Sequence, residues 1–143
     1  MALRLETPKF GMVEYNPEDV VRVPGGLPGF RQLEHFLLIE SEEHEPLKFL
    51  QSIDEPLISF PLIDPRIVCP DYQVGLDASD AAALGLEEPT QALIYCIVTL
   101  EADPLKSTAN LRAPLVINTE RMVGRQVLLS DAEYSVAEPL LRS

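Results

Sequence analysis

The chain has 143 residues, 46% of them hydrophobic, and its 11 basic and 23 acidic side chains give a formal net charge of −12. This length predicts one domain, residues 1–143, which can bury roughly 70% of its unfolded surface without disulfides or metals. The negative charge argues against direct nucleic-acid binding, because phosphates are bound by Lys and Arg. It favours a basic protein partner, although solubility alone is a second explanation.

The N-terminal sequence MALRLETPKF carries charges and lacks the apolar segment of a signal peptide. The longest apolar run is Ala92–Val98, far shorter than the roughly 20 residues of a membrane-spanning helix. The two cysteines, Cys69 and Cys96, stand among apolar neighbours, which favours reduced, buried thiols. We therefore expect a cytoplasmic protein that does not contact membranes.

Thirteen prolines and seven glycines divide the chain into short runs rich in Val, Ile, Leu, Phe and Tyr, a pattern typical of a small antiparallel β fold. The first run, ALRLET, alternates, so Leu3 and Leu5 are predicted to face a core. Further strands are predicted at VVRV (20–23), HFLLIE (35–40), KFLQS (48–52), LISF (57–60), ALIYCIVTL (92–100), PLVIN (114–118) and RQVLLS (125–130). Because the 92–100 run is apolar on both faces, it is predicted to be a central, fully buried strand.

One helix is predicted, in the segment DASDAAALG. Asp77 or Ser79 can cap its N-terminus, and Gly85 can end it in the left-handed conformation. The predicted fold class is therefore mostly β, a small single-domain antiparallel β-barrel-like fold with one short helix at about residues 78–85.

Two segments rich in proline are interpreted structurally. VPGGLPGF (23–30) has the glycines of a tight loop anchored by Phe30. Leu57–Tyr72 contains three prolines, which cannot donate to a sheet, so it is predicted to be an edge strand and its exit loop. Such an edge would leave a set of polar residues available to a partner: Asp54, Glu55, Asp64, Asp71 and Tyr72. The alternative is a protected edge that packs only on the core.

The chain lacks the patterns expected of an enzyme or a metalloprotein. His35 and His44 are isolated, and the G-x-S-x-G, H-E-x-x-H and C-x-x-C motifs are absent. An EF-hand-like spacing from Asp77 fails, because Ala81 and Ala82 occupy the positions that require an oxygen ligand and a glycine. We expect no catalytic residues, no metal and no cofactor.

Several motifs occur together in an order that carries a family resemblance: GLPGF, FLQSIDEPLISFPLIDP, PDY, NLRAPLVIN, GRQVLLS and, near the end, YSVAEPLL. Together they cover nearly the whole chain, and they resemble the flagellar assembly factor FliW family. The resemblance implies a cytoplasmic, non-enzymatic β-barrel-like protein with two protein partners. One is flagellin, and the other is CsrA, an RNA-binding repressor of flagellin translation that the free protein would bind and inhibit.

The resemblance also singles out residues near the end of the chain. Asn110 and Asn118 match the polar ends of the NLxAPxxIN motif, and each is expected either to fix a turn or, alternatively, to touch a partner. Tyr134, Pro139 and Leu140 are interpreted as a strap over the barrel.

Two other functions stay open at this point, a chaperone dedicated to flagellin and a small-molecule-binding β-barrel with a preformed apolar cavity. A monomer is expected.

Overall fold

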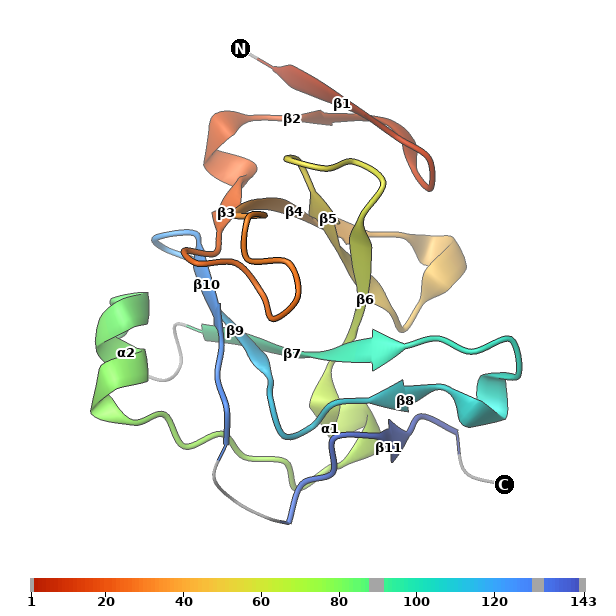
Figure 1. Ribbon diagram of the computed structural model, residues 1–143, viewed down its shortest axis with the longest axis vertical. Coiled ribbons are helices and arrows are strands. Elements are labelled where there is room, and N and C mark those ends of the chain that lie inside the picture. Colours follow the sequence, from red (N-terminus) through yellow and green to blue (C-terminus); the bar gives the residue numbers. More distant parts are fainter. Residues whose placement is uncertain (1, 88–91, 130–132, 142–143) are drawn as a thin grey trace.

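The computed structural model describes residues 2–87, 92–129 and 133–141. Seven strands close into a barrel (Figure 1). They are β3 (Val21–Arg22), β4 (His35–Glu40), β5 (Lys48–Ser52), β6 (Ser59–Ile63), β7 (Ala92–Thr99), β9 (Leu115–Asn118) and β10 (Val123–Gln126). Their order is β7-β6-β5-β4-β3-β10-β9, and β9 pairs back with β7. The predicted mostly-β, barrel-like fold is confirmed, with β3–β10 as a parallel pair among the antiparallel ones.

The remaining elements surround this barrel. β1 (Leu3–Thr7) and β2 (Gly11–Tyr15) form a separate hairpin, and β8 (Thr108–Ala109) with β11 (Glu138–Pro139) extends the sheet beyond β7. The helical segments are η1 (Pro17–Asp19), η2 (Glu42–His44), η4 (Pro104–Lys106), α1 (Pro65–Val68) and α2 (Ala78–Leu84). Within the described ranges, α2 is the only helix of seven or more residues, and none is long and apolar enough to span a membrane.

The hairpin turn covers the outer face of β5. Phe10, in the turn, meets Phe49 edge-on with ring centroids 5.2 Å apart, and the Lys9 ammonium lies 4.5 Å from the same ring. Phe49 is fully buried as a result. On β1 itself Leu5 is buried, but Leu3 is 41% exposed, so its predicted burial is wrong. Leu3 pairs with the last residue of β2, at the open end of the hairpin away from this turn.

The barrel interior is filled by side chains, including one from a loop. Leu27, in the glycine-rich loop, is buried among core residues of the surrounding strands such as Leu50 and Ile117. Gly26 makes the loop possible, because its φ is +66° and a Cβ there would lie 2.4 Å from the Phe30 carbonyl oxygen. Phe30 packs edge-on against Phe60, with centroids 5.1 Å apart. The predicted anchoring by Phe30 is confirmed.

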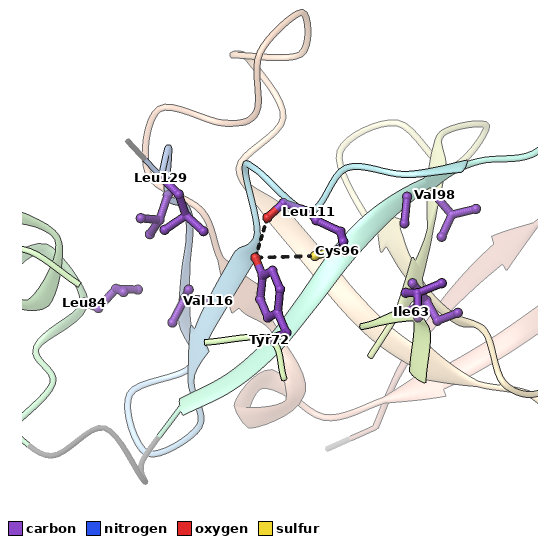
Figure 2. Packing of buried hydrophobic residues seen from close by; sticks show 11 residues of the cluster. Ile63, Tyr72, Leu84, Cys96, Val98, Leu111, Val116 and Leu129 are labelled. Atoms are coloured by element: carbon purple, nitrogen blue, oxygen red, sulfur yellow. Dashed lines mark hydrogen bonds between the residues drawn. The ribbon is translucent and has the colours of Figure 1, made fainter. Parts of the chain in front are cut away.

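A second core lies outside the barrel, on the other face of β7 (Figure 2). Tyr72 is buried there, its hydroxyl donates to the Leu111 carbonyl oxygen at 2.5 Å, and the Cys96 thiol donates to the tyrosine oxygen at 3.9 Å. Because β7 separates two cores, its apolar residues are needed on both faces. Full burial does not follow, since Leu93 is 39% exposed.

The segment Leu57–Tyr72 does not form an edge strand. β6 pairs with β5 on one side and with β7 on the other, so the predicted edge is wrong. Pro61 lies opposite Phe49 of β5, and the ladder with β7 begins only at the next residue, Leu62. A proline is tolerated in this internal strand because only part of the strand is paired on both sides.

The short helix α2 begins and ends as predicted. The Asp77 carboxylate accepts a hydrogen bond from the Asp80 N–H at 2.8 Å, and Gly85 adopts φ +67°. A Cβ on Gly85 would lie 2.8 Å from both Cδ and Nε of Arg121. The guanidinium group therefore rests against the C-terminus of α2, where a cation complements the helix dipole.

The C-terminal segment forms a strap, but it lies over the second core outside the barrel and not, as was predicted, over the barrel itself. The Tyr134 ring lies 4.5 Å from that of Tyr72, and its hydroxyl accepts from the Gln73 N–H at 2.9 Å. Pro139 pairs with β8 in β11, and the Leu140 N–H donates to the Ser107 carbonyl at 3.1 Å.

Candidate partner-binding groove

The candidate site lies where β6 leaves β7. The two strands pair only at Leu62–Ile97 and Ile63–Cys96. The next residue, Asp64, then caps α1 by accepting from the Arg66 N–H at 3.0 Å, which turns the chain out of the sheet. The first half of β7, Ala92–Tyr95, keeps β9 as its partner on one side. In the described part of the chain, no strand pairs with its other side.

A groove of about 440 Å³ runs along this unpaired side. Its lining comes from the end of β6, α1, the following loop and β7: Asp64, Pro65, Arg66, Tyr72, Val74, Ala92, Leu93, Ile94 and Tyr95. Because the Tyr72 hydroxyl is bonded to Leu111, its ring is held in place. The groove thus combines apolar walls with one exposed strand edge.

Acidic side chains surround the Tyr95 end of the groove. Burial raises the pKa of Tyr95, and Glu40, Asp64 and Glu45 raise it further against the opposing effect of Lys48. Three carboxylates belong to this rim, which we call the acidic rim: Glu40, Glu45 and Asp64. Lys48 and Arg66 are the basic residues among them, so the rim keeps a net negative charge.

Lys48 is already occupied within the rim. Its ammonium lies 2.8 Å from a Glu45 carboxylate oxygen and 4.0 Å from one of Glu40. The hydrogen bond to Glu45 is the largest cause of the raised pKa of Lys48. One lysine cannot neutralise both glutamates, so a cationic partner would still gain from approaching them.

The groove carries no catalytic arrangement that the geometry supports. Among the residues that the structure describes, no three His, Cys, Asp or Glu side chains come together as metal ligands. Tyr95 and Tyr72 line the groove without a neighbouring histidine. What the groove offers is apolar contact, backbone hydrogen bonding and attraction for positive charge, which are the properties of a peptide-binding surface.

The structure separates the predicted site residues. Asp64 and Tyr72 both line the groove, and Asp71, next to Tyr72, is exposed. The expectation that the Tyr72 side chain is available to a partner is wrong, because it is only 3% exposed beneath the strap. Its role is to form the groove wall.

Asp54 and Glu55 lie at the opposite end of β4, away from the acidic rim. Asp54 Oδ2 accepts from the N–H groups of Glu34 and His35 at 2.8 and 3.0 Å, and its Oδ1 lies 3.1 Å from His35 Nδ1. The Glu55 N–H donates to the Ser52 hydroxyl at 2.9 Å. Both residues shape the turns that join β3–β4 and β5–β6.

Asn110 and Asn118 fix turns, as one of the two interpretations predicts. Asn110 Oδ1 accepts from two backbone N–H groups, at 3.1 and 3.2 Å. Asn118 is 1% exposed and uses both ends of its amide. Its Nδ2 donates to the Leu84 carbonyl at 2.8 Å, and its Oδ1 accepts from the Glu120 N–H at 3.0 Å. It therefore joins α2 to the β9–β10 turn.

Sequence reasoning missed Tyr95 and Leu93 as groove residues. Both lie in the run that was expected to be wholly buried. The available signal was the tyrosine itself, because a phenol inside an aliphatic run needs water or a hydrogen-bond partner. The acidic rim was visible only in part, since Glu40 and Asp64 are brought together by the pairing of β4, β5 and β6.

Comparison with known proteins agrees with this fold over its full length. The FliW protein family model matches residues 4–140. The chain belongs to the FliW family. The flagellar assembly factor FliW of Thermoanaerobacter pseudethanolicus is 41% identical over 140 residues, which cover 97% of this chain and 93% of that protein. That of Bdellovibrio bacteriovorus is 38% identical over 136 residues, 95% of this chain and 78% of that protein.

A solved structure supports the same assignment. The crystal structure of a flagellar assembly factor FliW superposes with a TM-score of 0.89 at 32% identity and covers 98% of both chains. The family resemblance carried by the sequence motifs is therefore confirmed. Flagellar assembly is not an enzymatic role, in keeping with the absence of catalytic motifs from the sequence.

Proposed function

We propose that this FliW-family chain is a non-enzymatic, protein-binding regulator of flagellar assembly that works in the cytoplasm. It binds flagellin before export. When flagellin has been secreted, the free chain binds a CsrA-type translational regulator and relieves its repression of flagellin translation. The observation that supports this most is the groove beside the unpaired edge of β7, whose acidic rim suits a basic protein segment.

The charge of the chain supports the regulator as a partner. A protein that binds RNA through basic surfaces is attracted to a chain of net charge −12. Once bound, the acidic chain repels RNA phosphates over roughly 8 Å, the Debye length at physiological salt, even where it does not cover the RNA site. The same charge disfavours direct binding of nucleic acid by the chain itself.

Flagellin would also bind at an apolar groove or a free sheet edge of the chain. The family resemblance implies that its terminal region is held before assembly, and an unassembled segment can bind in an apolar groove or at a sheet edge. The chain acts as a monomer in this scheme. Two of the partner-binding residues predicted from the sequence remain exposed near the groove, Asp64 and Asp71.

A chaperone dedicated to flagellin, without a regulator partner, is the second candidate function, and the groove and family membership suit it equally well. A small-molecule-binding barrel is disfavoured, because Leu27 and the surrounding core residues fill the interior that would hold a ligand.

Calorimetric titration tests the proposal. The chain is titrated with the CsrA-type regulator from the same cell, first alone and then with flagellin already bound. Tight binding that flagellin abolishes is the expected result. Binding to flagellin but not to the regulator would leave the dedicated chaperone, and binding to neither would overturn the proposed function.

A further inference from the structure

We propose that the groove binds its partner by strand addition: an extended segment with a basic side chain on one face and apolar side chains on the other pairs with the free edge of Ala92–Tyr95. This inference deepens the proposed function, because it names the binding mode and the chemistry of the bound segment. It commits to a protein segment, and it rests on the geometry of one strand edge, one groove and one charged rim.

The strand edge supplies the first argument. In an antiparallel ladder, successive residues direct their backbone N–H and C=O groups alternately to the two sides of the strand. Ala92–Tyr95 use one side for β9. The other side faces the groove where β6 would have continued, had the Asp64 cap not turned the chain into α1. A segment in this position extends the line of β6 and runs antiparallel to β7.

The two faces of β7 supply the second argument, since a bound strand shares them. Pairing places Glu40, Lys48, Leu62 and Ile97 in one row on one face of the sheet. Tyr95 is two residues from Ile97 and so belongs to the same face, in agreement with the electrostatic effect of Glu40 on its pKa. Leu62, Tyr95 and Ile97 belong to the barrel core on this face, and the acidic rim lies beside Tyr95. The side chain of the bound segment nearest Tyr95 therefore meets the acidic rim and should be Lys or Arg.

The intervening side chains meet a different environment. Ile94 and Cys96 lie on the opposite face and pack in the second core, together with Tyr72 and Val74. Tyr72, Val74 and Ile94 all line the groove. Side chains of the bound segment on this face should be apolar, such as Val, Ile or Leu. The predicted segment thus has a basic side chain beside Tyr95 and apolar side chains on the opposite face, over about four residues, which matches the length of the free edge.

A matched pair of substitutions tests the charge requirement. Asp64→Asn removes one rim charge but keeps the side-chain oxygen that caps α1, because Asn caps helices as well as Asp. Asp103→Asn is the control. Asp103 also precedes a proline and accepts from the N–H two residues on, at 3.0 Å, but it lies beyond the far end of β7. The probe is a capped hexapeptide of alternating Lys and Val, titrated into the isotopically labelled chain and followed by NMR.

Backbone methylation of the probe tests strand pairing itself. Two versions of the hexapeptide carry N-methyl groups on alternate residues, so that each blocks the N–H groups of one edge only. We expect the amide signals of Ala92–Tyr95 to shift with the parent peptide. One methylated version should bind at least about ten-fold more weakly and the other about as well as the parent, because losing the N–H groups of the paired edge removes about 1.4 kcal/mol or more. Asp64→Asn should weaken binding roughly two- to five-fold, and Asp103→Asn should leave it unchanged.

The inference is overturned if those amides do not respond, if both methylated peptides behave alike, or if the two substitutions have equal effects. These outcomes are separate from failure of the proposed function. Peptide binding at the edge without binding of flagellin or the regulator would contradict the proposed function alone. Binding of either whole protein without a response at Ala92–Tyr95 would contradict strand addition alone.

Discussion

Replacement of Asn118 by Ala should destabilise the fold. Two short hydrogen bonds are lost, from Nδ2 to the Leu84 carbonyl at 2.8 Å and to Oδ1 from the Glu120 N–H at 3.0 Å. Two longer ones, to Gly85 and from Arg121, are both 3.3 Å. With about 1 kcal/mol for each short bond and about half of that for each long one, the loss is about 3 kcal/mol.

Urea denaturation followed by circular dichroism measures this loss. With an m value of about 2 kcal/mol/M, the midpoint should fall by about 1.5 M at unchanged m. Asn110→Ala is the control, since that side chain is only half-buried and accepts two longer bonds; its loss should be about 1 kcal/mol. A change below about 0.5 kcal/mol for Asn118→Ala would refute the assignment of this residue to turn fixation.

Asn118→Asp separates the two ends of the amide. The new carboxylate keeps the acceptor for the Glu120 N–H but faces the Leu84 carbonyl with an oxygen instead of a donor. The pKa of this buried carboxyl should be raised, so the penalty is complete at neutral pH and decreases as the pH falls towards about 4, the unfolded value. A stability difference from the parent that does not depend on pH would contradict this reasoning.

Three further predictions concern other positions. Gly85→Ala should lower the free energy of unfolding by about 1–2 kcal/mol, because φ is +67° and the Cβ displaces the Arg121 side chain. Gly75→Ala, with open space around the Cβ, should change it by less than about 0.5 kcal/mol. Equal urea midpoints for the two variants would refute this. Burial alone would raise the pKa of Asp54, but hydrogen bonds from two backbone N–H groups and a histidine lower it overall. Asp54→Asn should therefore lose stability at neutral pH, and its difference in stability from the parent should vanish as the pH falls through the lowered pKa. A pH-independent difference in chemical denaturation would contradict this. Burial raises the pKa of the Cys96 thiol to about 12, so iodoacetamide at pH 8 should leave Cys96 unmodified until the protein is unfolded, and mass-spectrometric detection of rapid native labelling would show that the second core is open.

Much of the fold was predictable because its signals are local. The capping Asp77, the alanine run and Gly85 define α2 within nine residues, and the structure places the helix there. The glycine-rich loop could be predicted for the same reason, since positive φ at Gly25, Gly26 and Gly29 is a property of the loop itself.

The errors arose where tertiary pairing decides the outcome. Pro61 indicated an edge strand, but a proline excludes only one backbone hydrogen bond. On the β7 side, β6 begins to pair only after Pro61, so the proline is tolerated although β6 has a neighbouring strand on each side. β2, β8, β11 and α1 were missed. β8 and β11 are very short and pair with each other across a long stretch of chain, whereas β2 lies beside β1 in a hairpin and α1 is a short turn capped by Asp64.

The candidate site was predictable only in part. Asp64 was identified, whereas Tyr95 and the acidic rim depend on the register of four strands. Tyr72 was identified for the wrong reason, since an aromatic side chain near polar residues resembles a contact residue until its burial is known. Both Asn residues were selected through the family motif, and in this chain their side chains fix turns.

Hydrogen exchange of the chain, alone and in complex with the CsrA-type regulator, tests the central claim most directly. The account predicts slower exchange of amides within Ala92–Tyr95 on complex formation, at the residues whose N–H groups face the groove. Protection confined to a different surface, such as that around the exposed side chains of Leu128 and Val136, with Ala92–Tyr95 exchanging as in the free chain, would show that the groove is not the partner site.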